Sequence, residues 1–200
     1  MPYWLDDQLM RNLALFFQRF SFLRTEDVQQ LQQLAVSRTY AAGEIFVPIG
    51  TRRQKVGILE KGLSRGYRIK ASGEEVSVTF AKEGELVAAH DVIFYQVPTE
   101  QQIHFLEDSR VWVFDYRDIE RLAADTPRID RVRQALIQDF LVKVLHRLET
   151  FLVYSPEQRY RWLQKAEPEL LERVQQKYMA SFMGITPVSL SRLRKRLRQP

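Results

Sequence analysis

The residues best suited to chemistry lie near the C-terminal end of the sequence. Cationic and hydroxyl side chains gather there, interleaved with leucines. Ammonium and guanidinium groups bind phosphate oxygens, and an arginine can also donate two parallel hydrogen bonds to O6 and N7 of guanine. Hydroxyls contact bases or phosphates, and a valine packs on a thymine methyl group. The set indicates a nucleic-acid contact surface made of Lys177, Thr186, Val188, Ser189, Arg192, Lys195 and Arg196.

The charge distribution points to the same end of the chain. The net charge is +5, and residues 173–200 hold seven basic residues and no acidic residue. The preceding 172 residues hold 23 basic and 25 acidic residues, a net charge of −2. A basic patch on a near-neutral body favours a polyanionic partner, whereas a solvated basic helix is the plain alternative.

Two helices joined by a tight turn would position these side chains. We expect this arrangement over residues 176–197, where Ala180 is small enough for a helix crossing and Gly184 tolerates positive φ at the turn. Thr186 is suited to cap the second helix and Pro187 to occupy its first position. The pattern predicts a helix-turn-helix, whose second helix enters the major groove of DNA. Its inward stripe would be Leu190, Leu193 and Leu197.

The first two thirds of the chain combine helical and strand patterns. Residues 3–35 read mostly as helix, with Thr25 as an N-cap of a second helix. From Val36, about eight short β-rich runs separated by glycine turns predict a compact antiparallel barrel or jelly roll. Within residues 76–80, Val76, Val78 and Phe80 alternate with Ser77 and Thr79, which is the pattern of a half-buried strand.

A long helix is expected from Pro127 to about Tyr154. Five of its apolar residues follow a 4, 3, 4, 3 spacing, which is typical of a coiled-coil seam and predicts a homodimer. Ser155, Pro156 and Gln158 then start a new helix with a capping box. We therefore expect an α+β chain with domains at 1–126, 127–154 and 155–200. The predicted seam consists of Ile137, Leu141, Val144, Leu148 and Phe151.

Composition excludes several other classes of protein. Cysteine is absent, so disulfides and thiolate metal sites are excluded, and a reducing cytoplasm fits. No apolar run is long enough to span a bilayer, and the first residues do not read as a signal peptide. His90, His104 and His146 lack the spacing of metal ligands, although a haem sensor using one histidine stays open. No nucleophile and base stand together, so we expect neither an enzyme nor a cofactor.

The chain resembles the Crp/Fnr family of bacterial transcription regulators over nearly its whole length. The glycine turns at Gly43, Gly62, Gly73 and Gly84 and the segments "SPEQRYRWL", "PELLERV" and "KYMASFMGITPVSLSRLRKRL" carry the resemblance. The last segment is the most specific, and it is similar to the short regulators common in Bacteroidetes. The resemblance implies a jelly-roll-like β-roll sensor domain, a dimerisation helix and an all-α helix-turn-helix domain.

The resemblance also implies how DNA would be read. Arg192 matches the family's most regular base-contacting arginine, and Thr186 and Ser189 match positions that touch phosphate or base. Val188 stands where the family often has a base-reading glutamate, so an acceptor for cytosine N4 is missing and the resemblance does not fix the target sequence. Only two residues follow Arg198, so we expect no C-terminal wing. Implied partners are a near-palindromic duplex, a second copy of the chain and RNA polymerase.

The cyclic-nucleotide cassette of the family matches poorly. Counting back from "VWVFDY" places the cassette on residues 87–100, with its Gly-Glu at Ala88 and Ala89 and its phosphate-binding pair at Thr99 and Glu100. No arginine or lysine occurs between Lys82 and Arg110, and a carboxylate repels phosphate. We therefore predict no response to cyclic AMP.

Two interpretations of the β-roll pocket stay open, and one alternative function stays open for the C-terminal helices. The pocket either takes another, less anionic ligand or is filled by side chains such as Phe94, Tyr95 and Phe105. The alternative for the whole chain is a small-molecule sensor whose helical C-terminal domain contacts a protein instead of DNA. Steep salt dependence and a sequence preference would distinguish a DNA-binding protein.

Overall fold

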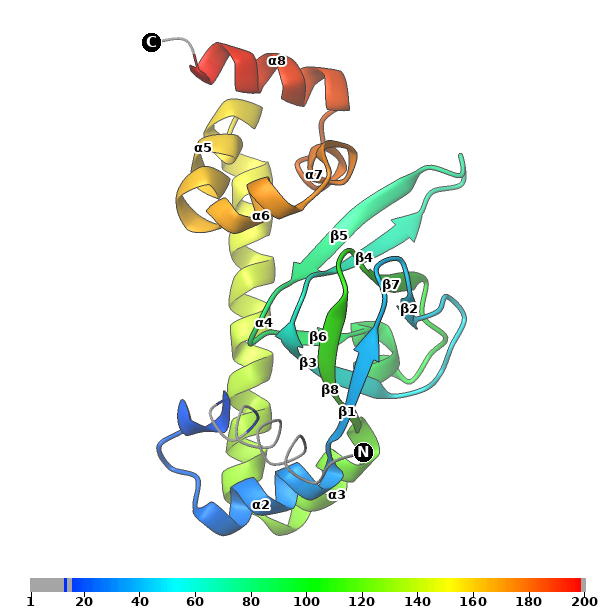
Figure 1. The fold of residues 1–200 in the computed structure, drawn as a ribbon, viewed down its shortest axis with the longest axis vertical. Coiled ribbons are helices and arrows are strands. Elements are labelled where there is room, and N and C mark those ends of the chain that lie inside the picture. Colours follow the sequence, from blue (N-terminus) through cyan, green and yellow to red (C-terminus); the bar gives the residue numbers. More distant parts are fainter. Residues whose placement is uncertain (1–12, 14–15, 199–200) are drawn as a thin grey trace. The chain divides into compact units, whose positions relative to one another are not determined.

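The computed structural model describes residue 13 and residues 16–198 (Figure 1). Residues 3–12, 14 and 15 of the predicted N-terminal helix lie outside the described residues. The structure divides into two compact units. We call Met1–Gly66 with Phe80–Gln138 the β-roll unit, and Tyr67–Thr79 with Asp139–Pro200 the helical unit. The domain boundaries predicted from sequence stay a proposal.

Eight strands form two four-stranded sheets, as the glycine-punctuated pattern predicts (Figure 1). One sheet has the order β1-β8-β3-β6 and the other β2-β7-β4-β5. In the first sheet, β8 pairs antiparallel with β1 and with β3, and β3 pairs antiparallel with β6. This confirms the antiparallel β-roll. The strands are β1 (Val36–Tyr40), β2 (Ile45–Val47), β3 (Lys55–Lys61), β4 (Ser64–Ile69), β5 (Glu75–Ala81), β6 (Leu86–Ala88), β7 (Gln101–Phe105) and β8 (Ser109–Asp115).

Aromatic rings form the centre of the roll. The rings of Tyr40, Phe46 and Phe105 lie 4.7 to 5.7 Å apart between centroids and are buried. Gly57 on β3 passes close to this cluster, because a Cβ there would lie 2.6 Å from Val111 and 3.1 Å from Phe46. The interior of the roll is therefore a packed core.

Helices cover a second core within the β-roll unit. α2 (Thr25–Leu34), α3 (Tyr116–Asp125) and the start of α4 (Pro127–Val153) contribute apolar residues that pack with Ile58, Trp112 and Phe114. Thr25 is the first helical residue and not the N-cap, so that prediction is wrong. Arg24 takes the cap position, and its N–H donates to the Asp27 carboxylate at 2.8 Å.

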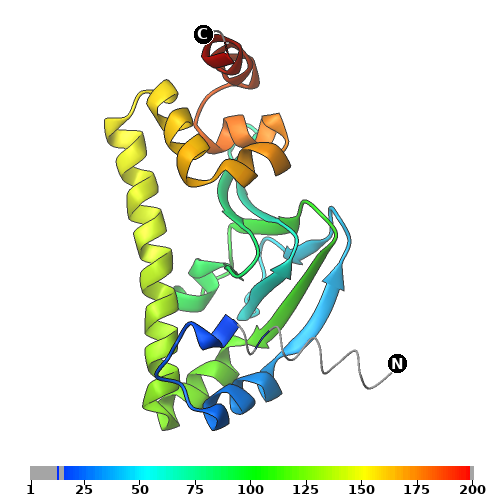
Figure 2. The same ribbon diagram turned by 60° about the vertical axis from the view of Figure 1, so that its left-hand side comes forward.

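The helical unit follows the predicted order of helices (Figure 2). α5 (Pro156–Ala166) starts at a capping box, since Gln158 N–H donates to Ser155 Oγ at 3.3 Å and Ser155 N–H donates to Gln158 Oε1 at 2.9 Å. Glu167 is the C-cap of that helix. The helices that follow are α6 (Pro168–Arg173), α7 (Gln176–Phe182) and α8 (Pro187–Arg198).

The half-buried strand predicted at residues 76–80 is confirmed as part of β5, but its most buried side chain is polar. Val76, Val78 and Phe80 are half-buried, whereas Ser77 between them is fully buried. Ser77 belongs to the helical unit, and its N–H donates to Ser181 Oγ on α7 at 3.0 Å. A helix therefore covers the strand on the face that carries Ser77.

Candidate nucleic-acid interface

The turn between α7 and α8 has the backbone that its residues predict. Gly184 has φ of +68°, and a Cβ there would lie 2.8 Å from Cε1 of Phe151. Both the left-handed conformation and the close ring therefore favour glycine. Ile185 N–H donates to the carbonyl of Ala180 at 3.0 Å, and Ala180 is fully buried. This confirms the predicted helix-turn-helix geometry.

The start of α8 is capped as expected. Ser189 N–H donates to Thr186 Oγ1 at 3.1 Å, and the two hydroxyl oxygens lie 2.9 Å apart. Gln176 on α7 adds a hydrogen bond from Nε2 to the carbonyl of Pro187 at 2.9 Å. These contacts fix the first turn of α8 relative to α7. Each hydroxyl keeps acceptor capacity for an outside donor.

α8 separates apolar and polar faces. Leu190 and Leu193 are buried together with Met179 and Met183, while Leu197 is half-buried. Val188 is 60% exposed, and Ser189 and Arg192 are also exposed. The predicted contact residues therefore lie on the surface, and the predicted leucines hold the helix in place.

The cations of this region differ in their partners. Within the described chain, Arg192 and Lys195 make no hydrogen bond or ion pair, so their charges are available to an outside anion. Arg196 pairs with Glu157 at 2.5 Å, and Lys177 Nζ lies 4.6 Å from the ring centroid of Tyr178. Arg194 instead turns inward and donates to the carbonyl of Leu171 at 3.3 Å.

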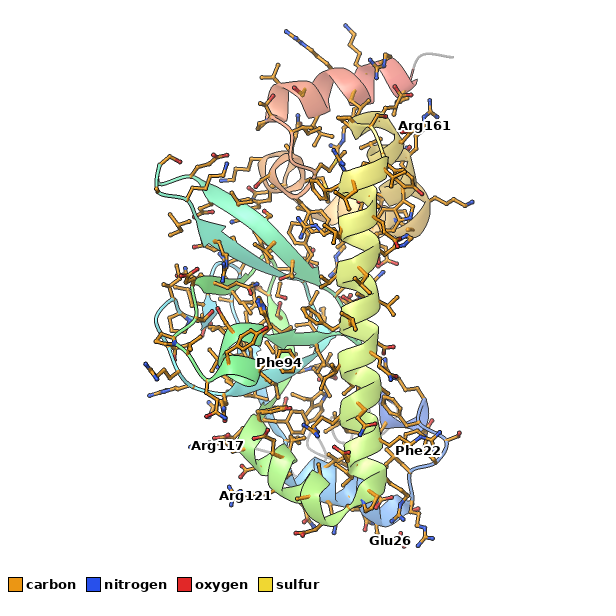
Figure 3. All side chains as sticks on the ribbon, turned by 180° about the vertical axis from the view of Figure 1, so that it is seen from behind. Phe22, Glu26, Phe94, Arg117, Arg121 and Arg161 are labelled. Carbon is orange, nitrogen blue, oxygen red and sulfur yellow. The ribbon has the colours of Figure 1, made fainter. Side chains whose placement is uncertain are left out.

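A shallow groove of about 460 Å³ lies between the first turn of α5 and α8. Glu157, Ser189, Arg192 and Arg196 line it. Arg161, which projects from α5 in Figure 3, also donates to the Glu157 carboxylate at 3.1 Å. Hydrogen bonds from Arg161 first, and then from Arg196, hold the pKa of Glu157 below its usual value. One acidic group therefore lies inside an otherwise cationic surface.

Arg147 on α4 joins three segments of the helical unit. Its guanidinium donates to the carbonyl of Val78, to that of Ser77 at 3.3 Å and to that of Phe182 at 3.1 Å. It also lies 3.9 Å from the ring centroid of Phe182. Burial lowers the pKa of Arg147 to about 10, because carbonyl dipoles replace only part of its hydration. Arg147 therefore holds α7 next to the β4–β5 hairpin.

Arg159 on α5 connects that helix to the C-terminal end of α4. It is buried, and its Nη1 donates to the carbonyls of Thr150 at 2.9 Å and Tyr154 at 3.3 Å. Its guanidinium stacks 4.3 Å above the ring centroid of Phe151. These bonds add a donor to carbonyls at the C-terminal end of α4, where the helix itself supplies few N–H groups.

The predicted seam of α4 is largely solvent-exposed in the single chain. Leu141, Val144 and Leu148 are between 43% and 52% exposed, and Ile137 is half-buried. Phe151 is 39% exposed and packs beside Gly184, so it also serves the helix-turn-helix.

Two of the four residues of the predicted effector pocket donate hydrogen bonds to one carboxylate. Thr99 and Glu100 donate to Asp91, which starts η1 (Asp91–Tyr95), whereas Ala88 ends β6 and Ala89 is separated from η1 by His90. Phe105 is buried in the roll, but Phe94 and Tyr95 are 46% and 71% exposed. The expectation that those two side chains fill the roll is therefore wrong. Phe94 comes from η1, a helix that ends near the surface (Figure 3).

The histidines lie in separate places. His146 stacks on Trp162 with ring centroids 5.0 Å apart, while His104 is on β7 and His90 precedes η1. Among the described residues, no three side chains of the metal-binding types are grouped to hold an ion. No helix in the described ranges has the length and apolarity to cross a membrane.

Sequence reasoning did not identify Asp91, Arg147 or Glu157. Asp91 and Glu157 each stand in the first turn of a helix, where an acidic residue is ordinary. Arg147 lies among mixed residues of a long helix, and its partners are 35 and 69 to 70 residues away. No local pattern marks such contacts.

The comparisons with known proteins agree with this geometry. Residues 37–126 match the family model of the cyclic nucleotide-binding domain. That range holds all the strands from β2 to β8, most of β1, and α3. No curated protein sequence matches the chain.

Solved structures extend the similarity to the helices. A Eubacterium rectale protein assigned to the Crp/Fnr family of transcriptional regulators has a TM-score of 0.71 at 13% identity, over 92% of this chain and 87% of that one. FixK2 from Bradyrhizobium japonicum has a TM-score of 0.71 at 15% identity, over 82% and 84%. The c-di-GMP-responsive global regulator CLP of Xanthomonas campestris has 0.69 at 14%, over 88% and 92%. The chain therefore carries a match to the cyclic nucleotide-binding domain at residues 37–126 and has the fold of the Crp/Fnr transcription regulators.

Proposed function

We propose that the protein is a sequence-specific DNA-binding transcription regulator and not an enzyme. The observation that carries the proposal is the exposed face of α8, where Arg192 and Lys195 have no partner in the described chain. Buried leucines hold the opposite face, so the helix that carries the cations has a fixed orientation within the helical unit. A preorganised cationic helix following a tight turn is the geometry that reads a major groove.

The roles follow from position along α8. Its first two turns carry Val188, Ser189 and Arg192, which are placed for base edges, with Arg192 directed at guanine. Thr186 shares the capping contact and is placed for a phosphate or a base. Lys177, Lys195 and Arg196 are placed for phosphates, which position the protein without reading sequence.

We also infer that the protein acts as a homodimer through the seam residues of α4. The exposed seam residues Leu141, Val144, Leu148 and Phe151 follow a 3, 4, 3 spacing, which suits a matching helix from a second copy. Two-fold symmetry then predicts a near-palindromic operator with half-site centres ~34 Å apart. RNA polymerase is the further partner that a regulator of this kind requires, and the cytoplasm is the compartment that holds both.

We infer, in addition, that the β-roll does not respond to cyclic AMP. No arginine or lysine occurs between Lys82 and Arg110, and Glu100 stands at the position of the phosphate-binding pair. A buried phosphate needs cationic or converging N–H donors, and a neighbouring carboxylate opposes it.

Selection of bound sequences from random duplex DNA tests the proposal. Wild-type protein should enrich a near-palindrome, and Arg192→Ala should lose about 1–3 kcal/mol on that site and relax one base position. Lys195→Ala should weaken binding to all sequences and reduce the slope of log K against log salt by about 1. The measurement is fluorescence anisotropy over a range of salt concentrations.

Arg117→Ala is the matched control for Arg192→Ala. Arg117 is an exposed arginine of the β-roll unit that pairs with Asp115 at 2.6 Å (Figure 3). It should leave DNA affinity unchanged. Binding without sequence preference, or Arg192→Ala at wild-type affinity, would contradict the assigned role. A flat salt response would favour a protein partner for the helical unit.

A further inference from the structure

The segment between β6 and β7 encloses a carboxylate. Asp91 is 6% exposed, and three donors of the same segment reach its two oxygens. Val92 N–H lies 3.0 Å from Oδ1, while Thr99 Oγ1 and Glu100 N–H lie 2.9 Å and 3.1 Å from Oδ2. We call Asp91, Val92, Thr99 and Glu100 the carboxylate cradle.

A neighbouring hydrogen bond orients the hydroxyl donor of the cradle. Thr99 is 1% exposed, and Gln101 N–H donates to its Oγ1 at 2.9 Å. That bond uses one lone pair of the hydroxyl oxygen. The hydroxyl proton has two acceptors in reach, and Asp91 Oδ2 at 2.9 Å is nearer to Thr99 Oγ1 than the Gln101 carbonyl at 3.2 Å. Oriented O–H and N–H groups converging on one anion are the chemistry of an oxyanion site.

The cradle coincides with the cassette position assigned by sequence. Thr99 and Glu100 fall on the pair that would bind the phosphate, and residues 37–126 match the cyclic nucleotide-binding domain. We propose that Asp91 is a built-in anion, which occupies the donors that this fold would otherwise offer to a phosphate. The β-roll is thereby held in one state by its own carboxylate.

A tethered carboxylate competes strongly with a dissolved ligand. Asp91 is covalently present at a high effective concentration, so no ligand has to be bound from solution. A phosphate entering beside it would bring a second negative charge into a buried site, which is costly. The inference deepens the proposed insensitivity to cyclic AMP and rests on that part of the proposed function, not on DNA binding.

Removing the carboxylate should expose the donors to an external anion. In full-length Asp91→Ala, Glu100 N–H loses Asp91 Oδ2 as an acceptor and Thr99 Oγ1 keeps the carbonyl of Gln101 at 3.2 Å, so the midpoint of thermal unfolding should fall. Inorganic phosphate, compared with chloride at equal ionic strength, should then raise the midpoint by about 3 °C or more at ten times its Kd. Wild-type protein should show no phosphate-specific shift.

Two variants make the result specific. Asp108→Ala removes an exposed carboxylate that accepts from Ala42 N–H at 2.9 Å, and it should gain no phosphate response. Adding Thr99→Val to Asp91→Ala should abolish the response by removing the hydroxyl donor. A phosphate shift equal in wild type and Asp91→Ala, or absent from Asp91→Ala, would overturn the proposal.

Should Asp91→Ala fail to fold, calorimetric titration of wild-type protein with cyclic AMP decides the question. No binding at millimolar nucleotide is expected, and binding would overturn the proposal. DNA affinity is measured on the same samples. Loss of DNA binding with an intact phosphate response would remove only the DNA proposal, and the reverse outcome would remove only the built-in anion.

Discussion

The β-roll unit and the helical unit each contain a charged side chain that is at least partly buried and bound mainly by backbone groups. The negative one is Asp91 in the carboxylate cradle, and the positive one is Arg147, whose contacts with the β4–β5 hairpin and α7 we call the Arg147 junction. Asp91 accepts from two backbone N–H groups and one hydroxyl, all from within nine residues of the chain. Arg147 donates to backbone carbonyls 35 and 69 to 70 residues away. Asp91 therefore organises one loop, whereas Arg147 connects segments that are distant in sequence.

This difference predicts which parts of the structure a substitution at each site destabilises. Loss of a contact inside one loop changes the stability of that loop and of the core beneath it. Loss of a contact between distant segments removes a constraint that the chain itself does not supply. Variants of Arg147 should therefore affect both the hairpin and α7, while variants of the cradle should stay local.

The largest effect is expected for Arg147→Met. Three carbonyls lose a charge-assisted donor, and relief of a buried charge offsets part of the loss, which leaves a destabilisation of about 2–4 kcal/mol. The amide of Ser77 bonds to Ser181 on α7, so it reports the junction. Its hydrogen exchange should accelerate about 30- to 700-fold, at 1.4 kcal/mol for each factor of ten.

Lys165→Met is the control for that experiment. Lys165 is an exposed cation of the same unit in the last turn of α5, so its loss should leave exchange at Ser77 unchanged. Arg147→Lys keeps the charge but replaces the guanidinium fork by one nitrogen, so it should lie between wild type and Arg147→Met. Unchanged exchange in Arg147→Met would show that the hairpin and α7 are held by other contacts.

The same distinction explains what could be predicted from sequence. The capping box of Ser155 and Gln158 and the Thr186 cap of α8 were predictable, because both partners lie within three residues. Ala180 and Gly184 follow from the steric needs of one turn. The burial of Ser77 has no local signal, because its hydrogen-bond partner Ser181 lies 104 positions away on α7.

The candidate site was predictable to a similar extent. Local spacing indicates which residues of α8 face outward, and Val188 and Arg192 are indeed exposed. The pairing of Arg196 with Glu157 spans 39 residues and has no local signal. The interpretation in which Phe94 and Tyr95 fill the pocket could not be tested from the sequence, and the short η1 helix leaves both side chains exposed.

A moderate and confined effect is expected for Thr99→Val. The substitution keeps the side-chain shape and removes the hydroxyl that donates to Asp91 and accepts from Gln101 N–H. Hydrogen bonds to charged groups contribute about 1.5–3 kcal/mol, so the free energy of unfolding of the β-roll unit should fall by about that amount. Urea titration with a Trp112 fluorescence signal measures it. A change in DNA affinity or in Ser77 exchange would show that the cradle is not local.

The smallest effect, and the one of opposite sign, is expected for Glu157→Gln. Glu157 places a negative charge within the cationic face and binds Arg196 at 2.5 Å. Because the hydrogen bonds from Arg161 and Arg196 lower the pKa of Glu157, the carboxyl is ionised at neutral pH and the pair is lost only as pH falls through that lowered value. Removing the charge frees Arg196 for phosphate, so affinity should rise about two- to five-fold on every DNA sequence at low salt and converge with wild type at high salt. Glu169→Gln on α6 is the matched control and should leave affinity unchanged. If Glu157→Gln weakened binding, Arg196 would need Glu157 to hold it in its productive position, and the cationic face would be an ordered network instead of a set of independent charges.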